Sequence, residues 1–206
     1  MQTLRKGSKG VLVSQLQRSI NLMPDGIFGD LTEEGVKQFQ SANGLKPDGV
    51  VGPLTWEKIQ AMTSTVISKS KRDIKEIIIH CSDTPEGRDV SVADIRRYHL
   101  TIGFSDIGYH YIIYRDGSIH NGRDIDVSGA HCLNHNSRSI GICYIGGQAA
   151  KGGQPKDTRT DAQKKALLSL LKELKRLYPG ATIHGHNEFA AKACPCFNVK
   201  NEYSNL

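Results

Sequence analysis

The segment ATIHGHNEFAAKACPCFN, residues 181–198, holds the side chains with the clearest capacity for chemistry. A short β-type run ends in His186, and the loop that follows carries Lys192 and Cys194. Neutral imidazole and thiolate both suit Zn²⁺, and a catalytic zinc keeps three protein ligands and leaves a fourth position for water. One more ligand must come from elsewhere in the chain. The best candidate is His80, which closes the apolar run at residues 77–79.

Spacing alone does not decide which residues bind the metal, because the chain has eight histidines and five cysteines. His184 and His186 lie two residues apart on one predicted strand and therefore point to the same face. Cys194 and Cys196 present the same ambiguity. A lone histidine at a strand end, such as His80, is more often structural than a ligand.

Length and composition indicate a globular protein that enters no membrane. The 206 residues are 38% hydrophobic and 23% charged, and no apolar run approaches the roughly 20 residues of a membrane span. The N-terminus, MQTLRKGSKG, has charge but no following apolar core, so it does not resemble a secretory signal. We therefore expect that the protein is made in the cytosol and does not insert into a membrane. There the odd number of cysteines favours free thiols or metal ligands over disulfides.

The net charge of +6 is spread along the chain. A diffuse excess of this kind favours anionic surfaces, such as nucleic acid or bacterial wall polymers, without identifying one. Because no basic stripe with interleaved aromatic residues is present, we expect no nucleic-acid partner.

An internal repeat organises the first sixty residues. Residues 25–32 read DGIFGDLT and residues 48–55 read DGVVGPLT, which share the pattern D-G-x-x-G-x-L-T. Each copy supplies a turn followed by a threonine, Thr32 or Thr55, that we expect to cap a helix. An earlier helix is predicted from the apolar spacing that begins at Val11. The sequence therefore predicts a small all-α three-helix domain at residues 1–60, followed by a Ser/Thr/Lys-rich linker at residues 61–73.

The rest of the chain, residues 74–206, alternates predicted strands and helices. Strands are expected at residues 74–82, 109–114, 118–120, 139–147 and 182–186. Ser91 begins one predicted helix, and Thr160 begins a longer one with a single apolar stripe that ends before Pro179. This order predicts an α/β domain with a mixed sheet covered by helices, and function gathered at strand ends and loops.

Two resemblances extend this interpretation. The stretches LRKGSKGVLVSQLQ, DGIFGDLTEEGVKQFQ and DGVVGPLTWEKI resemble the peptidoglycan-binding module found at the ends of many wall hydrolases; the alternative is a turn device in a generic helical bundle. The stretches IIIHCSDT, IRRYHLTIGFSDIGYHYIIYRDGSIHNGRD, HNSRSIGICYIGG and HGHNEFAAKACPCF resemble zinc-dependent N-acetylmuramoyl-L-alanine amidases. These belong to the type-2 amidase and peptidoglycan-recognition-protein superfamily, and the phage lysozymes of the amidase type are especially similar.

The second resemblance implies the site residues. In that family's pattern His80, His186 and Cys194 are the zinc ligands, and Tyr109 of G-Y-H and Lys192 of A-K-A-C are catalytic side chains beside the metal. Zinc lowers the pKa of its bound water, which would attack the amide that joins N-acetylmuramic acid to L-alanine. Zinc, Lys192 and the Tyr109 phenol would stabilise the oxyanion, and Tyr109 is also a candidate to relay the proton to the leaving amine.

Five further residues near these motifs have weaker assignments. The resemblance requires neither His184 nor Cys196 as a ligand. It places His131 and Asn136 near the substrate groove, for substrate contact or loop hydrogen bonding. Glu188 is a candidate to accept a hydrogen bond from the ring nitrogen of a metal-bound histidine that does not contact the metal.

Together these features predict a monomeric phage or prophage endolysin that acts on bacterial peptidoglycan. It would stay in the host cytoplasm until lysis and reach the wall through a separate pore-forming protein. Two alternatives remain open: a peptidoglycan receptor without turnover, and an endopeptidase that cuts within the stem peptide.

Overall fold

The computed structural model describes residues 2–20, 22–63, 67–149 and 153–206. The chain forms two compact units, residues 1–64 and 65–206, and each is described here by itself. Among the described residues, no helix is both long and apolar enough to cross a membrane.

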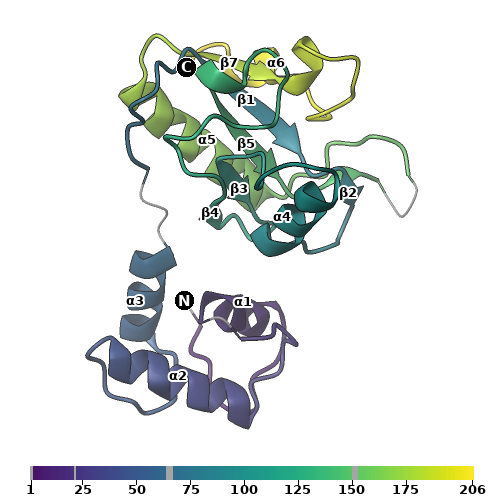
Figure 1. The fold of residues 1–206 in the computed structure, drawn as a ribbon. Coiled ribbons are helices and arrows are strands. Elements are labelled where there is room, and N and C mark those ends of the chain that lie inside the picture. The colour runs from purple at the N-terminus through teal and green to yellow at the C-terminus, as the bar shows by residue number, and fades with distance from the viewer. Residues whose placement is uncertain (1, 21, 64–66, 150–152) are drawn as a thin grey trace. The chain divides into compact units, whose positions relative to one another are not determined.

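The described part of the first unit contains three helices, α1 (Val11–Ser19), α2 (Asp30–Ala42) and α3 (Pro53–Thr63), as the sequence predicts (Figure 1). Apolar side chains from all three helices and from the segments before and between them form one core. Its buried members are Leu4, Val13, Leu16, Phe28, Val36, Val51, Trp56 and Ile59.

The sequence repeat appears as two equivalent hydrogen-bond networks. Gln17 on α1 donates from Nε2 to Asp25 Oδ1 at 2.7 Å, and its Oε1 accepts from the N–H of Gly26 at 2.9 Å. Gln40 on α2 makes the same bonds to the second copy, accepting from Gly49 at 2.9 Å. Both glutamine side chains are buried, so each glycine turn is tied to the preceding helix.

The prediction that Thr32 and Thr55 cap their helices is wrong. α2 begins at Asp30, with Gly29 at the N-cap, and α3 begins at Pro53. Each threonine lies inside the first turn, where its hydroxyl accepts from the buried glutamine, at 2.8 Å for Thr32 and 3.2 Å for Thr55. The threonines thus complete the glutamine networks and do not cap free helix amides.

A five-stranded mixed sheet forms the centre of the second unit, in the order β4-β3-β5-β1-β7. Only the pairing of β3 with β4 is antiparallel among these strands. The bounds are β1 Glu76–Cys81, β3 Tyr111–Ile113, β4 Ile119–Asn121, β5 Ser139–Tyr144 and β7 Thr182–Gly185. A separate pair joins β2 (Thr84–Pro85) and β6 (Gly147–Gln148). This confirms the mixed-sheet α/β fold.

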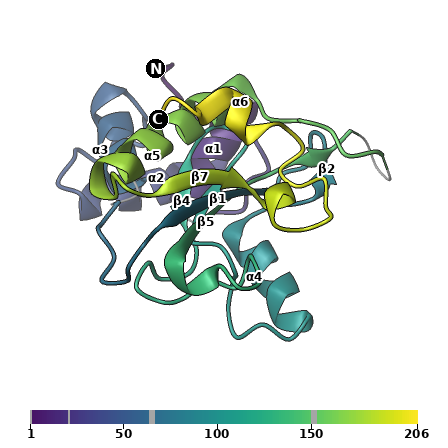
Figure 2. The same cartoon turned by 90° about the horizontal axis from the view of Figure 1, so that it is seen from above.

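Helices cover both faces of the sheet (Figure 2). α5 (Asp161–Leu177) packs its leucine stripe on one face, and α4 (Val92–Thr101) lies on the other. Thr160 and Ser91 cap these helices, as predicted. Side chains alternate along β1, so Ile77 and Ile79 join the α5 core while His80 points to the opposite face. The remaining short helices are η1 (Asn136–Arg138), η2 (His186–Glu188) and α6 (Val199–Tyr203).

The segment predicted as a linker, residues 61–73, is largely structured where it is described. Residues 61–63 belong to α3, and residues 64–66 lie outside the described part. Ser70 Oγ donates to the carbonyl of Ile125 at 2.8 Å. The Arg72 guanidinium donates to the carbonyls of Ile125 and Ser139 at 2.8 and 3.1 Å. The second unit therefore begins before residue 74, because these carbonyls fix the preceding segment in place.

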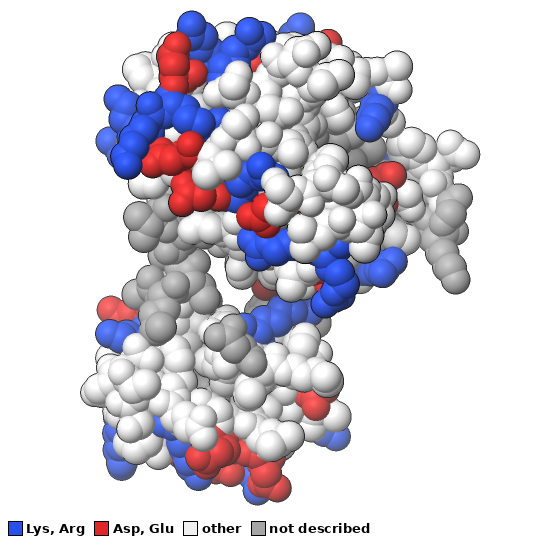
Figure 3. Space-filling view, viewed as in Figure 1, with Lys and Arg blue, Asp and Glu red and all other residues white. Residues whose placement is uncertain are grey.

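Charges of both signs are interspersed on the face of each unit that Figure 3 shows. Exposed ion pairs occur among the described residues, such as Lys156 with Glu86 at 2.9 Å. The positive excess is thus as diffuse on this face as it is along the sequence.

Candidate metal and catalytic site

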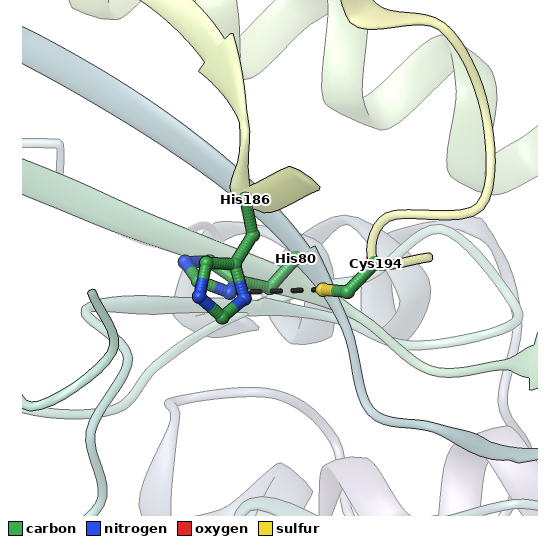
Figure 4. A group of neighbouring side chains, drawn as sticks. All are labelled: His80, His186 and Cys194. Atoms are coloured by element: carbon green, nitrogen blue, oxygen red, sulfur yellow. Dashed lines mark hydrogen bonds between the residues drawn. The ribbon is translucent and has the colours of Figure 1, made fainter. Parts of the chain in front are cut away.

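The fold brings His80, His186 and Cys194 together (Figure 4). His80 is the penultimate residue of β1, and His186 begins η2 directly after β7. Because β1 and β7 run parallel, with Ile79 opposite Gly185, both histidines leave the same edge of the sheet. Cys194 returns to that edge on the loop after η2. One ligand atom from each residue lies within 4.8 Å of the others.

The separation of these atoms fits a shared zinc ion. Cys194 Sγ lies 3.8 Å from His80 Nδ1, and the two imidazole centroids are 4.5 Å apart. Zinc–nitrogen and zinc–sulfur bonds at a tetrahedral angle would place such a pair about 3.6 Å apart. The N–H of Cys81 also donates to Cys194 Sγ, at 3.2 Å. Two imidazoles and one thiolate are a donor set that zinc prefers.

The structure distinguishes His186 from His184. Both ring nitrogens of His184 have hydrogen-bond partners outside the metal site. Nδ1 lies 2.9 Å from Glu188 Oε2, and Nε2 lies 2.8 Å from Thr182 Oγ1. The expectation that Glu188 supports a metal ligand is therefore wrong. Its carboxylate holds His184 and accepts from the N–H of Gly185 at 2.8 Å.

Cys196 is likewise separated from the metal site. Its Sγ lies 3.8 Å from Cys81 Sγ and 3.3 Å from the carbonyl oxygen of Gly147. Cys81 packs in the core beneath α5, on the face of the sheet opposite His80. Cys194 and Cys196 thus point in different directions although only Pro195 separates them.

Burial keeps the two candidate imidazoles neutral, which is the form that binds a metal. The His80 side chain is almost fully buried, and desolvation lowers its pKa well below the ordinary value. Desolvation also lowers the pKa of His186, and the positive charge of Lys192 lowers it further. Both shifts mean that these rings resist protonation as the pH falls.

Tyr109 and Lys192 lie beside this group. The Tyr109 ring, just before β3, is centred 5.1 Å from the His80 ring and 5.3 Å from the His99 ring. Desolvation raises the pKa of Tyr109 well above its ordinary value, so the phenol keeps its proton and can donate a hydrogen bond. Lys192 is exposed on the loop that carries Cys194.

His131 and Asn136 have different roles in the structure. Asn136 Oδ1 accepts from the N–H groups of His131 and Cys132, at 2.8 and 2.9 Å, which is loop hydrogen bonding. His131 is buried, and its Nδ1 lies 3.0 Å from His80 Nε2. Sequence reasoning missed this contact, because nothing in the spacing relates a loop residue to a strand end 51 positions earlier.

His110 should make the fold sensitive to acid. It is buried with its Nδ1 accepting from the N–H of Gly141 at 3.0 Å, and desolvation lowers its pKa to about 4. The unfolded chain takes up this proton near pH 6.5, so it binds more protons than the folded chain between these values. The free energy of unfolding must therefore decrease as the pH is lowered from about 6.5 to about 4, and His110 contributes about 3 kcal/mol to this decrease.

To test this prediction, the free energy of unfolding is measured by urea denaturation at several pH values. The native protein is compared with His110→Gln, both free of metal. We expect the free energy of unfolding of the native protein to fall more steeply between pH 7 and pH 4, by up to about 3 kcal/mol. Equal slopes for the two proteins would refute this assignment.

Residues 70–197 match the family model described as N-acetylmuramoyl-L-alanine amidase, well over half of the chain. The chain belongs to that family. This amidase is 46% identical over 130 residues to the endolysin of Klebsiella phage KP32, covering 63% of this chain and 85% of the relative. It is 42% identical over 132 residues to the endolysin of Escherichia phage T7, covering 64% and 87%. Residues 11–59 match a putative peptidoglycan binding domain.

Solved structures agree with the fold of the amidase unit. N-acetylmuramoyl-L-alanine amidase LysC from Clostridium intestinale superposes with a TM-score of 0.54 at 25% identity, covering 64% of this chain and 82% of that one. Bumblebee peptidoglycan-recognition protein SA superposes with a TM-score of 0.53 at 25% identity, covering 71% and 92%. The predictions of an amidase fold, a hydrolase and an N-terminal peptidoglycan-binding module are confirmed.

Proposed function

We propose that this amidase cleaves the bond between N-acetylmuramic acid and L-alanine with water activated by a zinc ion that His80, His186 and Cys194 hold. The observation that carries the proposal is the convergence of these three ligand atoms within 4.8 Å at one edge of the sheet. When bound, zinc supplies a Lewis acid and lowers the pKa of its water.

The side chains around the ligands supply the remaining chemistry. Tyr109 keeps its proton at neutral pH, so its phenol is suited to donate to the carbonyl oxygen as negative charge develops there. Lys192 is exposed, and it lies near enough to His186 for its positive charge to lower the pKa of that ring. The His80 ring is buried, and electrostatic interactions are stronger in a buried environment than in water.

The helical unit, residues 1–60, would anchor the enzyme to its insoluble substrate. Tethering a binding module to a catalytic unit raises the local substrate concentration without any new contact at the active site. The matches to phage endolysins support a role in lysis. The protein would then stay in the host cytoplasm until a separate pore admits it to the wall.

Product analysis separates this function from its alternatives. Purified peptidoglycan is digested with full-length protein, and the soluble fragments are identified by mass spectrometry. We expect peptides with a free L-alanine amino terminus, together with glycan strands whose lactyl groups end in carboxylates. Cuts within the stem peptide would show an endopeptidase, and binding to the wall without any cleavage would show a receptor.

A further inference from the structure

The two ring nitrogens of His80 face two different neighbours. Nδ1 lies 3.8 Å from Cys194 Sγ and so faces the proposed metal position. Nε2 lies 3.0 Å from His131 Nδ1. On the far side of that second ring, His131 Nε2 lies 3.3 Å from Ser139 Oγ. Three side chains thus form a single line that leads from the ligand group to β5.

Metal binding at His80 Nδ1 would determine which ring nitrogen of His80 and which of His131 carries a proton. A coordinated Nδ1 carries no proton, so Nε2 of His80 must carry it and donate. His131 Nδ1 must then accept, which leaves the proton of His131 on Nε2, directed at Ser139 Oγ. In this arrangement each contact has one donor and one acceptor.

The surrounding backbone holds the His131 ring in place. The side chain is only 9% exposed, and Ser139 is fully buried at the start of β5. A Cβ atom on Gly129 or Gly141 would lie 2.4 or 2.5 Å from His131 Cδ2. A side chain at either glycine would collide with the ring, so both glycines leave the space that the ring occupies.

We propose that His131 is a positioning residue, which accepts the Nε2 proton of His80 and thereby presents Nδ1 of His80 to the metal. Ser139 orients His131 in turn. Ligand histidines usually donate their second N–H to a carboxylate, a carbonyl or water, and loss of that partner typically costs 10- to 100-fold in metal affinity. Here an imidazole takes that place. The inference rests on the proposed zinc site and adds a residue that acts through His80.

The test compares two variants of the full-length protein that have nearly the same shape. His131→Asn keeps an acceptor oxygen near the position of Nδ1, whereas His131→Leu removes it. Zinc dissociation constants are measured without substrate, by competition with a chromophoric chelator. We expect about 10- to 100-fold weaker binding for His131→Leu and a change of less than about 5-fold for His131→Asn.

The absence of substrate separates this role from substrate contact, which would not alter zinc affinity. Equal affinity of His131→Leu and native protein would overturn the proposal, as would equal losses in both variants. A native protein that binds no zinc would instead overturn the proposed function.

A measurement on the native protein covers the case in which a variant does not fold. In zinc-loaded protein with ¹⁵N-labelled histidine, the His131 resonances should show a proton on Nε2 and none on Nδ1. A proton on Nδ1 in the loaded protein would overturn the proposal.

Discussion

Replacing Cys194 with serine is expected to abolish tight zinc binding and to lower the rate of amide cleavage by roughly 10³-fold or more. Serine removes the single sulfur ligand, and its neutral hydroxyl is a poor substitute for a thiolate. The change is small in volume, so the loop should keep its conformation. Zinc content by atomic spectroscopy and the initial rate of peptide release from peptidoglycan measure the two effects.

Cys196→Ser is the matched control for this experiment. The same substitution two residues away alters a thiol that contacts Cys81 and the carbonyl of Gly147 and that does not belong to the ligand group. We expect native zinc content and a native rate. Loss of zinc in Cys196→Ser, with retention in Cys194→Ser, would show that the ligand loop is assigned in the wrong register.

Tyr109→Phe should lower kcat by about 10²- to 10³-fold, which is the usual effect of removing one donor to a developing oxyanion. The substitution removes only the hydroxyl, so the ring contacts with His80 and His99 remain. Zinc affinity should therefore be unchanged. Single-turnover rates at saturating substrate, measured beside zinc titration, separate a catalytic role from a structural one.

Tyr98→Phe supplies the control, because that ring is 62% exposed on α4. Its rate should equal that of the native protein. If Tyr109→Phe retained the native kcat, or lost rate only in proportion to lost zinc, the phenol would have no direct part in catalysis.

Local patterns in the sequence predict the five strands of the central sheet and the helices α4 and α5, but not the strands β2 and β6 or the short helices η1, η2 and α6. The apolar run before His80 and the apolar stripe after Thr160 correspond to β1 and α5. Parallel pairing then brings the ends of β1 and β7 together, which is why residues 106 positions apart meet. This convergence follows from the order of strands in the sheet, and no local pattern contains it.

Spacing alone does not choose between near neighbours such as His184 and His186, which lie two residues apart. The family resemblance favours His186, and the contacts of His184 with Glu188 and Thr182 agree with that choice. The contact between His131 and His80 depends on how a loop folds over β5. The conformation of such a loop depends on many weak contacts with distant parts of the chain, so the periodicity of apolar residues in the sequence does not predict it.

The repeat in the helical unit shows the same limit. The glycines indicate its turns, and the threonines that follow them suggest helix caps because threonine often has that role. The structure instead pairs Thr32 and Thr55 with Gln17 and Gln40. A buried glutamine that bonds a turn across 15 residues leaves no signature in local propensity.

Removal and return of zinc test the central claim most directly. The full-length protein is stripped with a chelator, and its rate of amide cleavage is followed as zinc is added back. A site with three protein ligands predicts no cleavage without metal and a linear rise that stops at about one zinc per chain. Full activity in metal-free protein would contradict the account.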